Sequence, residues 1–193
     1  QSSVVADLVG VGGDLEIIPF RGEYYELTHD ATALIRGLVY PVPDPRYPFL
    51  GVHFTRGIGD HVHVGPNAVL ALAQEGYTRS TLSVAALRRI ATFRGTWALA
   101  RQHWRMGATE VAGSLSKSVF VRRCREYVPA LKSADLIRAA AGVRAQAVRR
   151  DGSLVDDFVI DRRDRLTLVR NAPSPAATAS LAIGERIAAG VQA

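Results

Sequence analysis

The 193-residue sequence is poor in cysteine, with Cys124 as its single example. One cysteine cannot form an intramolecular disulfide and argues against a zinc site built on thiolates, so the redox compartment stays open. No apolar run approaches the roughly 20 residues that span a bilayer, which predicts a soluble or peripheral protein. A signal peptide is also lacking, and the first residue is Gln1 rather than Met, so we expect that further N-terminal sequence belongs to the natural protein.

The positive charge is not gathered into a patch. The sequence has 24 Lys and Arg against 18 Asp and Glu, a net charge of +6, but no basic stripe with interleaved aromatic residues. Nucleic-acid binding is therefore not expected. With 48% hydrophobic residues at this length, the chain can bury a sizeable core.

The sequence lacks a dinucleotide-binding fingerprint, although one cluster of glycines resembles part of it. Glycines cluster at 10–14, but a helix-like segment (1–8) precedes them and a strand-like segment follows, which reverses the Rossmann order. We interpret 10–14 as a turn. Two strands are predicted at 15–20 and 21–27, with a bend at Arg21 and Gly22. Arg21 there either faces a carboxylate ligand or forms an ion pair with Glu23.

Alternating residues at 52–56 and 61–65 predict a β-hairpin. Period two places His53 and Thr55 on one face, and His61 and His63 share one face of the partner strand. Three histidines can bind a metal ion, but no carboxylate or cysteine has ligand-like spacing around them, so no metal site is predicted.

The next segments predict a layer of helices. The segment 65–68 is expected to break the strand, and a short helical turn is expected at 68–74. A helix at 83–105 is predicted to be capped by Ser83 and interrupted at Gly95, and another at 116–127 ends before Pro129. These helices are expected to cover a sheet.

Arg144 lies in an apolar strand at 141–146. A turn at Asp151 and Gly152 and a return strand at 154–160 follow it. Burial of a guanidinium costs several kcal/mol unless it meets an anion. Its partner is therefore either Asp156 or Asp157, or a substrate carboxylate held by the bidentate fork, and both alternatives stay open.

The C-terminal end predicts a strand at 166–169 that leads into a helix beginning at Pro175, with Ser174 as its cap. Small side chains follow at Ala176, Ala177 and Thr178. They allow a large flat group to approach the backbone N–H groups, as at an anion-receiving helix N-terminus. The alternative is a small-residue helix packed against a neighbouring element.

Seven segments, taken together and in this order, resemble one known family: 19–27, 40–45, 49–56, 65–68, 114–117, 141–146 and 171–180. The family is that of the L-2-hydroxyglutarate oxidases and dehydrogenases, flavoproteins of the D-amino-acid-oxidase-like superfamily. The resemblance covers nearly the whole chain. The sequence departs from the family in lacking the N-terminal Gly-rich FAD fingerprint and the acidic residue that holds the FAD ribose.

The resemblance implies an α+β fold with a mixed, largely antiparallel substrate-domain sheet covered by helices. A C-terminal strand and helix would belong to an incomplete Rossmann-like FAD-binding domain. The implied division is 1–14 for the end of a truncated FAD-domain segment, 15–160 for the substrate-binding domain and 161–193 for the FAD-binding strand and helix. Exposed apolar surface on the last helix is expected, with self-association through it.

The resemblance also implies a reaction, in which FAD oxidises the C2 alcohol of L-2-hydroxyglutarate by hydride transfer to flavin N5. His53 is the candidate base and Arg144 the candidate for holding the substrate carboxylate. The implied substrate-binding residues are Arg21, Tyr24, Tyr25, Asn67 and Arg144, and the implied cofactor-binding residues are Ser174, Pro175, Ala176, Ala177 and Thr178.

Two other functions stay open: an amine or amino-acid oxidase of the same superfamily, and a non-catalytic fragment without FAD. The implied partner is a small 2-hydroxy dicarboxylate rather than a nucleic acid. The expected location is cytoplasmic, with peripheral association with the inner membrane through the electron acceptor as an alternative. The isolated chain is expected to be inactive, because the Gly-rich unit holds most of the FAD.

Overall fold

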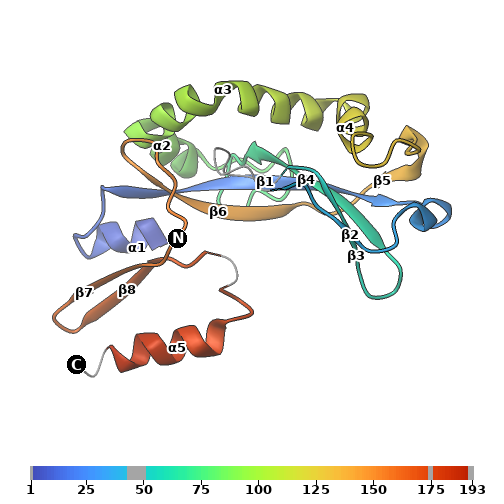
Figure 1. The fold of residues 1–193 in the computed structure, drawn as a ribbon. Helices are drawn as coiled ribbons and strands as arrows, with labels where there is room; N and C mark the ends of the chain where they lie inside the picture. Colours follow the sequence, from blue (N-terminus) through green and yellow to red (C-terminus); the bar gives the residue numbers. More distant parts are fainter. Residues whose placement is uncertain (1, 43–50, 174–175, 191–193) are drawn as a thin grey trace.

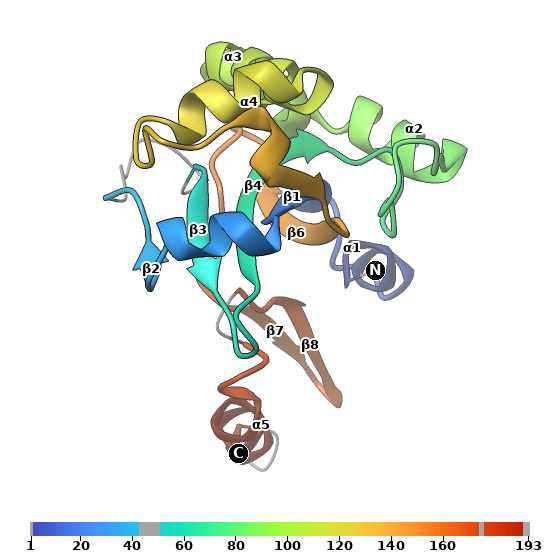
Figure 2. The same ribbon diagram turned by 90° about the vertical axis from the view of Figure 1, so that its right-hand side faces the viewer.

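The computed structural model describes residues 2–42, 51–173 and 176–190. A twisted antiparallel sheet forms the centre, helices α2, α3 and α4 cover one side of it, and α1, a small hairpin and α5 lie on the other (Figures 1 and 2). Every strand pair among the described residues is antiparallel. This agrees with the predicted helix-covered α+β sheet.

The longest strand organises the sheet. β1 (Leu15–Leu27) pairs with β4, β5 and β6, and β4 continues the sheet through β3 to β2. The other strands are β2 (Leu38–Val39), β3 (His53–Arg56), β4 (Val62–Leu70), β5 (Leu136–Arg138) and β6 (Gly142–Arg149).

The predicted bend within 15–27 is wrong, since β1 is continuous. Gly22 is extended and pairs with both Ala68 and Gly142. A Cβ atom at Gly22 would lie 2.9 Å from the Pro66 Cβ. The glycine therefore permits close approach of β4 rather than a change of direction.

The hairpin at 52–65 is confirmed, with His53 opposite Gly65 and Thr55 opposite His63. The predicted strand break at 65–68 and the helical turn at 68–74 are wrong, because β4 runs on to Leu70. A register shift between Glu23 and Tyr25 absorbs the irregular segment around Pro66, and pairing resumes at Asn67.

The covering helices are α2 (Val84–Thr92), α3 (Arg94–Leu115) and α4 (Lys117–Cys124). The Ser83 cap is confirmed, since its Oγ accepts a hydrogen bond from the Ala86 N–H at 3.3 Å. The interruption lies at Phe93, which is extended, and not at Gly95. Gly95 is buried inside α3, where a Cβ would lie 2.1 Å from the Arg149 carbonyl oxygen, so the glycine brings α3 onto the end of β6.

The main hydrophobic core lies between the sheet and α4. Fully buried Phe120 of α4 packs on Tyr25 of β1 with ring centroids 4.7 Å apart. The same cluster contains Phe54, Val62 and Val64 of the hairpin. Burial of these side chains fixes α4 and the hairpin on the sheet, at about 1.5–3 kcal/mol for each large apolar side chain.

The C-terminal part forms a second unit. β7 (Val159–Arg163) and β8 (Leu166–Asn171) make a separate hairpin, so the strand predicted at 166–169 is confirmed. The return strand predicted at 154–160 is wrong, since only Leu154 bridges to Val148. The Gln146 and Asn171 side-chain amides donate to the Val155 carbonyl and replace a strand ladder.

The first helix lies with this hairpin rather than with the large sheet. α1 (Ser2–Leu8) contributes the Ser2 hydroxyl, which donates to the Arg170 carbonyl at 2.7 Å. Buried Arg170 of β8 also binds Asp14 at 2.7 Å and Asp161 at 3.1 Å. The ends of the sequence therefore meet in space, although the predicted domain boundaries themselves stay a prediction.

The last helix, α5 (Ser180–Ala189), begins later than predicted. Residues 176–179 form a turn, and Ala179 precedes the helix without a side-chain cap. Ser174 and Pro175, the predicted cap and first helical residue, lie outside the described residues. α5 has no buried residue, and Leu181 is 90% exposed, as expected for this helix.

Candidate functional site

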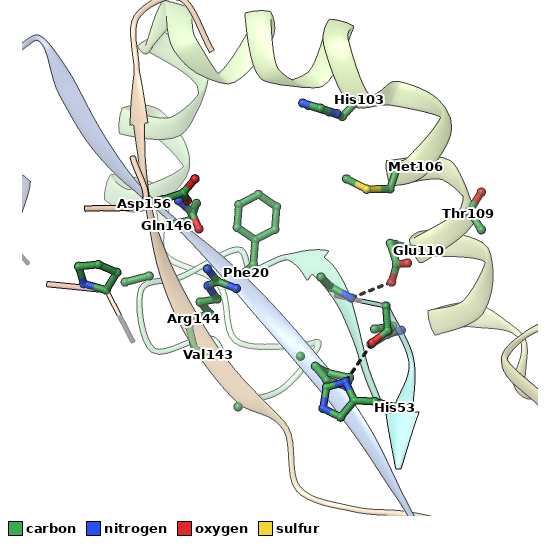
Figure 3. Close-up of a pocket in the computed structure, with 18 of the residues that line it drawn as sticks. Phe20, His53, His103, Met106, Thr109, Glu110, Val143, Arg144, Gln146 and Asp156 are labelled. Carbon is green, nitrogen blue, oxygen red and sulfur yellow. Dashed lines mark hydrogen bonds between the residues drawn. The ribbon is translucent and has the colours of Figure 1, made fainter. Parts of the chain in front are cut away.

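A large pocket lies between α3 and the strands β1, β4 and β6 (Figure 3). Its volume is about 1420 Å³, and Ala172 and Pro173 close one side. Of the side chains that the sequence suggested for the site, it brings four together: Tyr24, His53, Asn67 and Arg144. We call this cavity the main pocket.

The strand wall of the main pocket carries Arg144. Phe20 of β1 lies directly opposite Arg144 of β6, and both side chains line the cavity. The expectation that Arg144 is buried is wrong, because its side chain is exposed. The Asp157 carboxylate accepts a hydrogen bond from the Phe158 N–H at 2.7 Å, and Asp156 is exposed at the pocket. Burial therefore does not force a structural partner on Arg144.

His53 enters the main pocket from the start of β3, which lies between β2 and β4 in the sheet. Its Nδ1 lies 3.1 Å from the Gly51 carbonyl, which can only accept, so Nδ1 carries the hydrogen of this bond. The ring stacks on Tyr40 at 4.4 Å. Partial burial lowers the pKa of His53, and the bond to Gly51 opposes this only in part. The ring is thus favoured in its neutral form, with a free electron pair on Nε2.

The second wall comes from α3, and sequence reasoning missed it. His103, Met106 and Glu110 point from the helix toward the cavity (Figure 3). Buried Glu110 accepts a hydrogen bond from the Ala68 N–H at 2.8 Å and pairs with Arg123 at 2.8 Å. The available signal was the spacing of these three residues, which puts two titratable groups on one helix face together with a methionine.

Asn67 of β4 lines the main pocket and is held by Glu23 of β1. The Asn67 Oδ1 accepts from the Glu23 N–H at 3.0 Å, and its Nδ2 donates to the Glu23 carboxylate at 3.3 Å. Asn67 is 2% exposed. Its amide is therefore engaged by the protein, and it contributes to the wall rather than offering free hydrogen-bonding groups.

Glu23 collects further donors from separate elements. Its carboxylate accepts from Arg79 at 2.9 and 3.0 Å and from the Ser114 hydroxyl at 2.7 Å. Burial alone raises the pKa of Glu23, but the hydrogen bonds from Arg79, Ser114 and Asn67 outweigh it and lower the pKa to about 2. The group is therefore ionised at neutral pH, and its contacts join β1, β4, α3 and the segment containing Arg79.

Arg21 and Tyr25 do not line the main pocket. Arg21 is buried and pairs with Glu23 at 3.2 Å, as the ion-pair reading of the sequence expected. Tyr25 is 4% exposed and belongs to the hydrophobic core. Both border a smaller pocket of about 300 Å³, which Tyr24 also lines. Burial raises the pKa of Tyr24, and the charge of Tyr40 adds to this.

The residues expected to contact a cofactor are placed only in part. Ala176, Ala177 and Thr178 lie in the turn before α5 and do not line the main pocket. The chain enters this turn from Pro173, which does line it. Ser174 and Pro175 fall outside the described residues.

The described ranges contain neither a metal-binding cluster nor a membrane-spanning helix. No group of three or more His, Cys, Asp or Glu side chains there has a geometry that could hold a metal ion. His61, one of the hairpin histidines, instead contacts the Glu26 carboxylate at 2.5 Å. Likewise, no helix in those ranges has the length and apolar character needed to cross a membrane.

Comparison with known proteins places these residues in a family. The family model of FAD dependent oxidoreductases (DAO) matches residues 2–189. The L-2-hydroxyglutarate dehydrogenase of Indibacter alkaliphilus is 47% identical over 171 residues, which cover 89% of this chain and 43% of that protein. The mitochondrial L-2-hydroxyglutarate dehydrogenases of Caenorhabditis elegans and Homo sapiens are 44% and 43% identical, over 97% and 99% of this chain and 44% and 42% of theirs.

The chain spans less than half the length of these curated relatives. The match nevertheless extends over nearly all of its own residues, in agreement with the resemblance that the seven sequence segments indicated. The chain therefore belongs to the family of FAD dependent oxidoreductases (DAO).

Proposed function

We propose that this chain forms the C-terminal, substrate-side part of an FAD-dependent enzyme that oxidises L-2-hydroxyglutarate to 2-oxoglutarate. The observation that carries the proposal is the convergence of His53 and Arg144 on one pocket. One supplies a neutral imidazole and the other a guanidinium fork. An α-hydroxy acid needs both groups, a base for the hydroxyl proton and a cation for the carboxylate.

Arg144 is the residue assigned to the C1 carboxylate. Its exposed position on β6 leaves the side chain accessible from the pocket. A guanidinium can bind both oxygens of a carboxylate at once, which fixes the orientation of the neighbouring carbon as well as its distance. The substrate C2 atom is thereby held beside the strand wall formed by Phe20 and Tyr24.

His53 is the residue assigned to the C2 hydroxyl. Because Nδ1 is held by the Gly51 carbonyl, Nε2 is the nitrogen that can accept the hydroxyl proton. The lowered pKa of His53 keeps this nitrogen unprotonated at neutral pH. Stacking on Tyr40 restricts rotation of the ring, so proton acceptance needs little reorganisation.

The main pocket has dimensions and walls that fit a flavin beside the substrate. Its volume of about 1420 Å³ exceeds the roughly 300–1,000 Å³ of pockets for single small ligands. At the facing pair Gly22 and Gly142, the Pro66 and Tyr24 side chains approach the backbone closely and form this part of the wall. When bound, FAD would supply the two-electron acceptor of the reaction.

The residues assigned to the flavin edge are Ser174, Pro175, Ala176, Ala177 and Thr178. They follow Pro173, which lines the pocket, and the side chains at 176–178 are small. The Ala176 N–H donates to the Pro173 carbonyl at 3.0 Å, which ties the start of this turn to the pocket wall. The Gly-rich unit that would hold the rest of FAD is not among these residues.

A full-length protein that includes this chain tests the proposal. Its reduction of an artificial electron acceptor should be measured with L-2-hydroxyglutarate, D-2-hydroxyglutarate, L-glutamate, glycine and sarcosine. We expect turnover with L-2-hydroxyglutarate, and an acid limb of the kcat/KM profile below the ordinary pKa of histidine, about 6.5. Turnover with glycine, sarcosine or L-glutamate alone would instead identify an amine or amino-acid oxidase.

A further inference from the structure

The imidazole of His53 is held by two different contacts. Its Nδ1 bonds to the Gly51 carbonyl at 3.1 Å, and its face stacks on the Tyr40 ring, with 4.4 Å between the centroids and 17° between the planes. A single hydrogen bond leaves the ring free to tilt about the bonded nitrogen. The nearly parallel Tyr40 ring blocks that tilt. The orientation of His53 on the pocket wall (Figure 3) therefore depends on how firmly Tyr40 itself is held.

Tyr40 lies just beyond the point where pairing with β3 fixes the backbone. Strand β2 ends at Val39, which pairs with Phe54, and Tyr40 is the next residue. The Tyr40 side chain is 44% exposed. Exposed side chains change rotamer within picoseconds to nanoseconds. A fixed ring at this position therefore needs a further contact.

Thr55 provides that contact. The hydroxyl oxygens of Tyr40 and Thr55 lie 2.8 Å apart, the usual distance of an O–H···O hydrogen bond. Thr55 shares one face of β3 with His53, so the Tyr40 ring covers His53 while its hydroxyl reaches Thr55. The branched threonine side chain has few χ1 rotamers, and the neighbouring Phe54 is fully buried in the main core. The Thr55 hydroxyl is therefore a fixed point on a well-anchored strand.

We propose that Tyr40 and Thr55 are positioning residues for the reaction, which together fix the plane of the His53 ring so that Nε2 meets the substrate hydroxyl. Neither is among the described residues that line the main pocket, so both act through His53. This inference rests on the assignment of His53 as the base in the proposed function. It adds that proton transfer depends on a hydrogen bond outside the pocket.

The test breaks this hydrogen bond from each side in the full-length enzyme. Tyr40→Phe keeps the stacked ring and loses its hydroxyl, whereas Thr55→Val keeps the branched shape and loses its hydroxyl. Anaerobic stopped-flow mixing with L-2-hydroxyglutarate measures the limiting rate of flavin reduction and the apparent Kd of the substrate. Each variant should lower the limiting rate by roughly 2- to 12-fold, the net effect of one hydrogen bond, and should leave Kd within about twofold. The double variant should lose no more than either single variant, because both remove the same bond.

Two further variants complete the test. Tyr40→Leu removes the stacked ring as well and should lower the limiting rate by about 10- to 100-fold. Tyr127→Phe, at another exposed tyrosine outside both pockets, is the matched control and should change neither the rate nor Kd. The Tyr40–Thr55 bond is exposed to solvent, so all variants should keep the wild-type flavin content and a Tm within about 2 °C.

Several outcomes would overturn this inference while the proposed function stands. They are an unchanged rate of flavin reduction in Tyr40→Phe and Thr55→Val, losses that add in the double variant, or a weaker Kd at an unchanged rate. A fall in Tm or flavin content along with the rate also overturns it, since it marks a structural role. His53→Asn is measured in parallel. If it reduces flavin at the wild-type rate, or if the wild type does not oxidise L-2-hydroxyglutarate, the proposed function and this inference fail together.

Discussion

The ionised Glu23 carboxylate stabilises the fold by binding side chains from several elements. The substitution Glu23→Gln tests how much its charge contributes. The side chain is 13% exposed and is bound by Arg21, Arg79, Ser114 and Asn67. The glutamine keeps the shape and an acceptor oxygen, but removes the negative charge. Arg21, with a side chain only 8% exposed, would then lie buried without a counter-ion.

The magnitude follows from the pKa of Glu23, which lies at about 2 rather than at its ordinary value of 4.5. Each pKa unit corresponds to about 1.4 kcal/mol, so the ionised form contributes about 3 kcal/mol to the free energy of unfolding at neutral pH. Because the folded-state pKa is lowered, this contribution is present above pH 4.5 and is lost as the pH falls toward 2. At pH 3, less than half of it should remain.

Thermal melting followed by circular dichroism at pH 7 and pH 3 measures both effects. For a chain of this length, about 3 kcal/mol should lower the Tm of Glu23→Gln by roughly 6–12 °C at pH 7. The difference from wild type should shrink at pH 3. Glu75→Gln, at an exposed glutamate, is the matched control and should leave the Tm within about 2 °C.

Two results would refute the reasoning. A Glu23→Gln protein that melts with the wild type at pH 7 would mean that the charge contributes nothing. A Tm difference that is the same at pH 3 as at pH 7 would mean that the loss comes from packing and not from the ionised carboxylate.

Three further predictions concern the site and the isolated chain. In the full-length enzyme, His53→Asn should lower kcat by about 10²- to 10⁴-fold with unchanged flavin absorbance, and normal kcat would exclude His53 as the base. Arg144→Lys should lower kcat/KM by roughly 10- to 150-fold with an unchanged Tm, since Arg144 is exposed; a lowered Tm would indicate a structural role. The isolated chain should bind FAD more weakly than about 1 μM in a fluorescence titration, and should elute above monomer size in gel filtration unless Leu181→Asp removes the apolar contact.

Local sequence patterns were sufficient to predict several structural elements correctly. The alternation at 52–65 predicted the hairpin, because one face packs under α4 while the other meets the pocket or solvent. The Ser83 cap and the turns at 10–14 and Gly152 were predicted for the same kind of reason. In each case, the interactions that form the element join residues a few positions apart. A short stretch of sequence therefore contains all the information needed for the prediction.

Sequence-based predictions were wrong where contacts with residues distant in the sequence decide the role of a glycine or an arginine. Gly22 suggested a bend, but Pro66 of the neighbouring strand β4 lies so close that only a residue without Cβ fits there. Gly95 suggested a helix break, but the glycine accommodates the Arg149 carbonyl. Arg144 suggested a buried charge, yet its strand borders an open pocket. Burial and close approach are properties of the packed chain, and no local pattern contains them.

The residues of the candidate site likewise fall into those that the sequence predicted and those that only the structure revealed. Family motifs in the sequence alone were enough to name Tyr24, His53, Asn67 and Arg144, which come from four strands or their edges and meet in one pocket. The α3 wall, with Glu110 bound to the Ala68 N–H and His103 at a kink, was decided only by the tertiary structure. The physical reason is that a helix shows its apolar stripe in the sequence, whereas the cavity under it exists only once the helix has packed across the sheet.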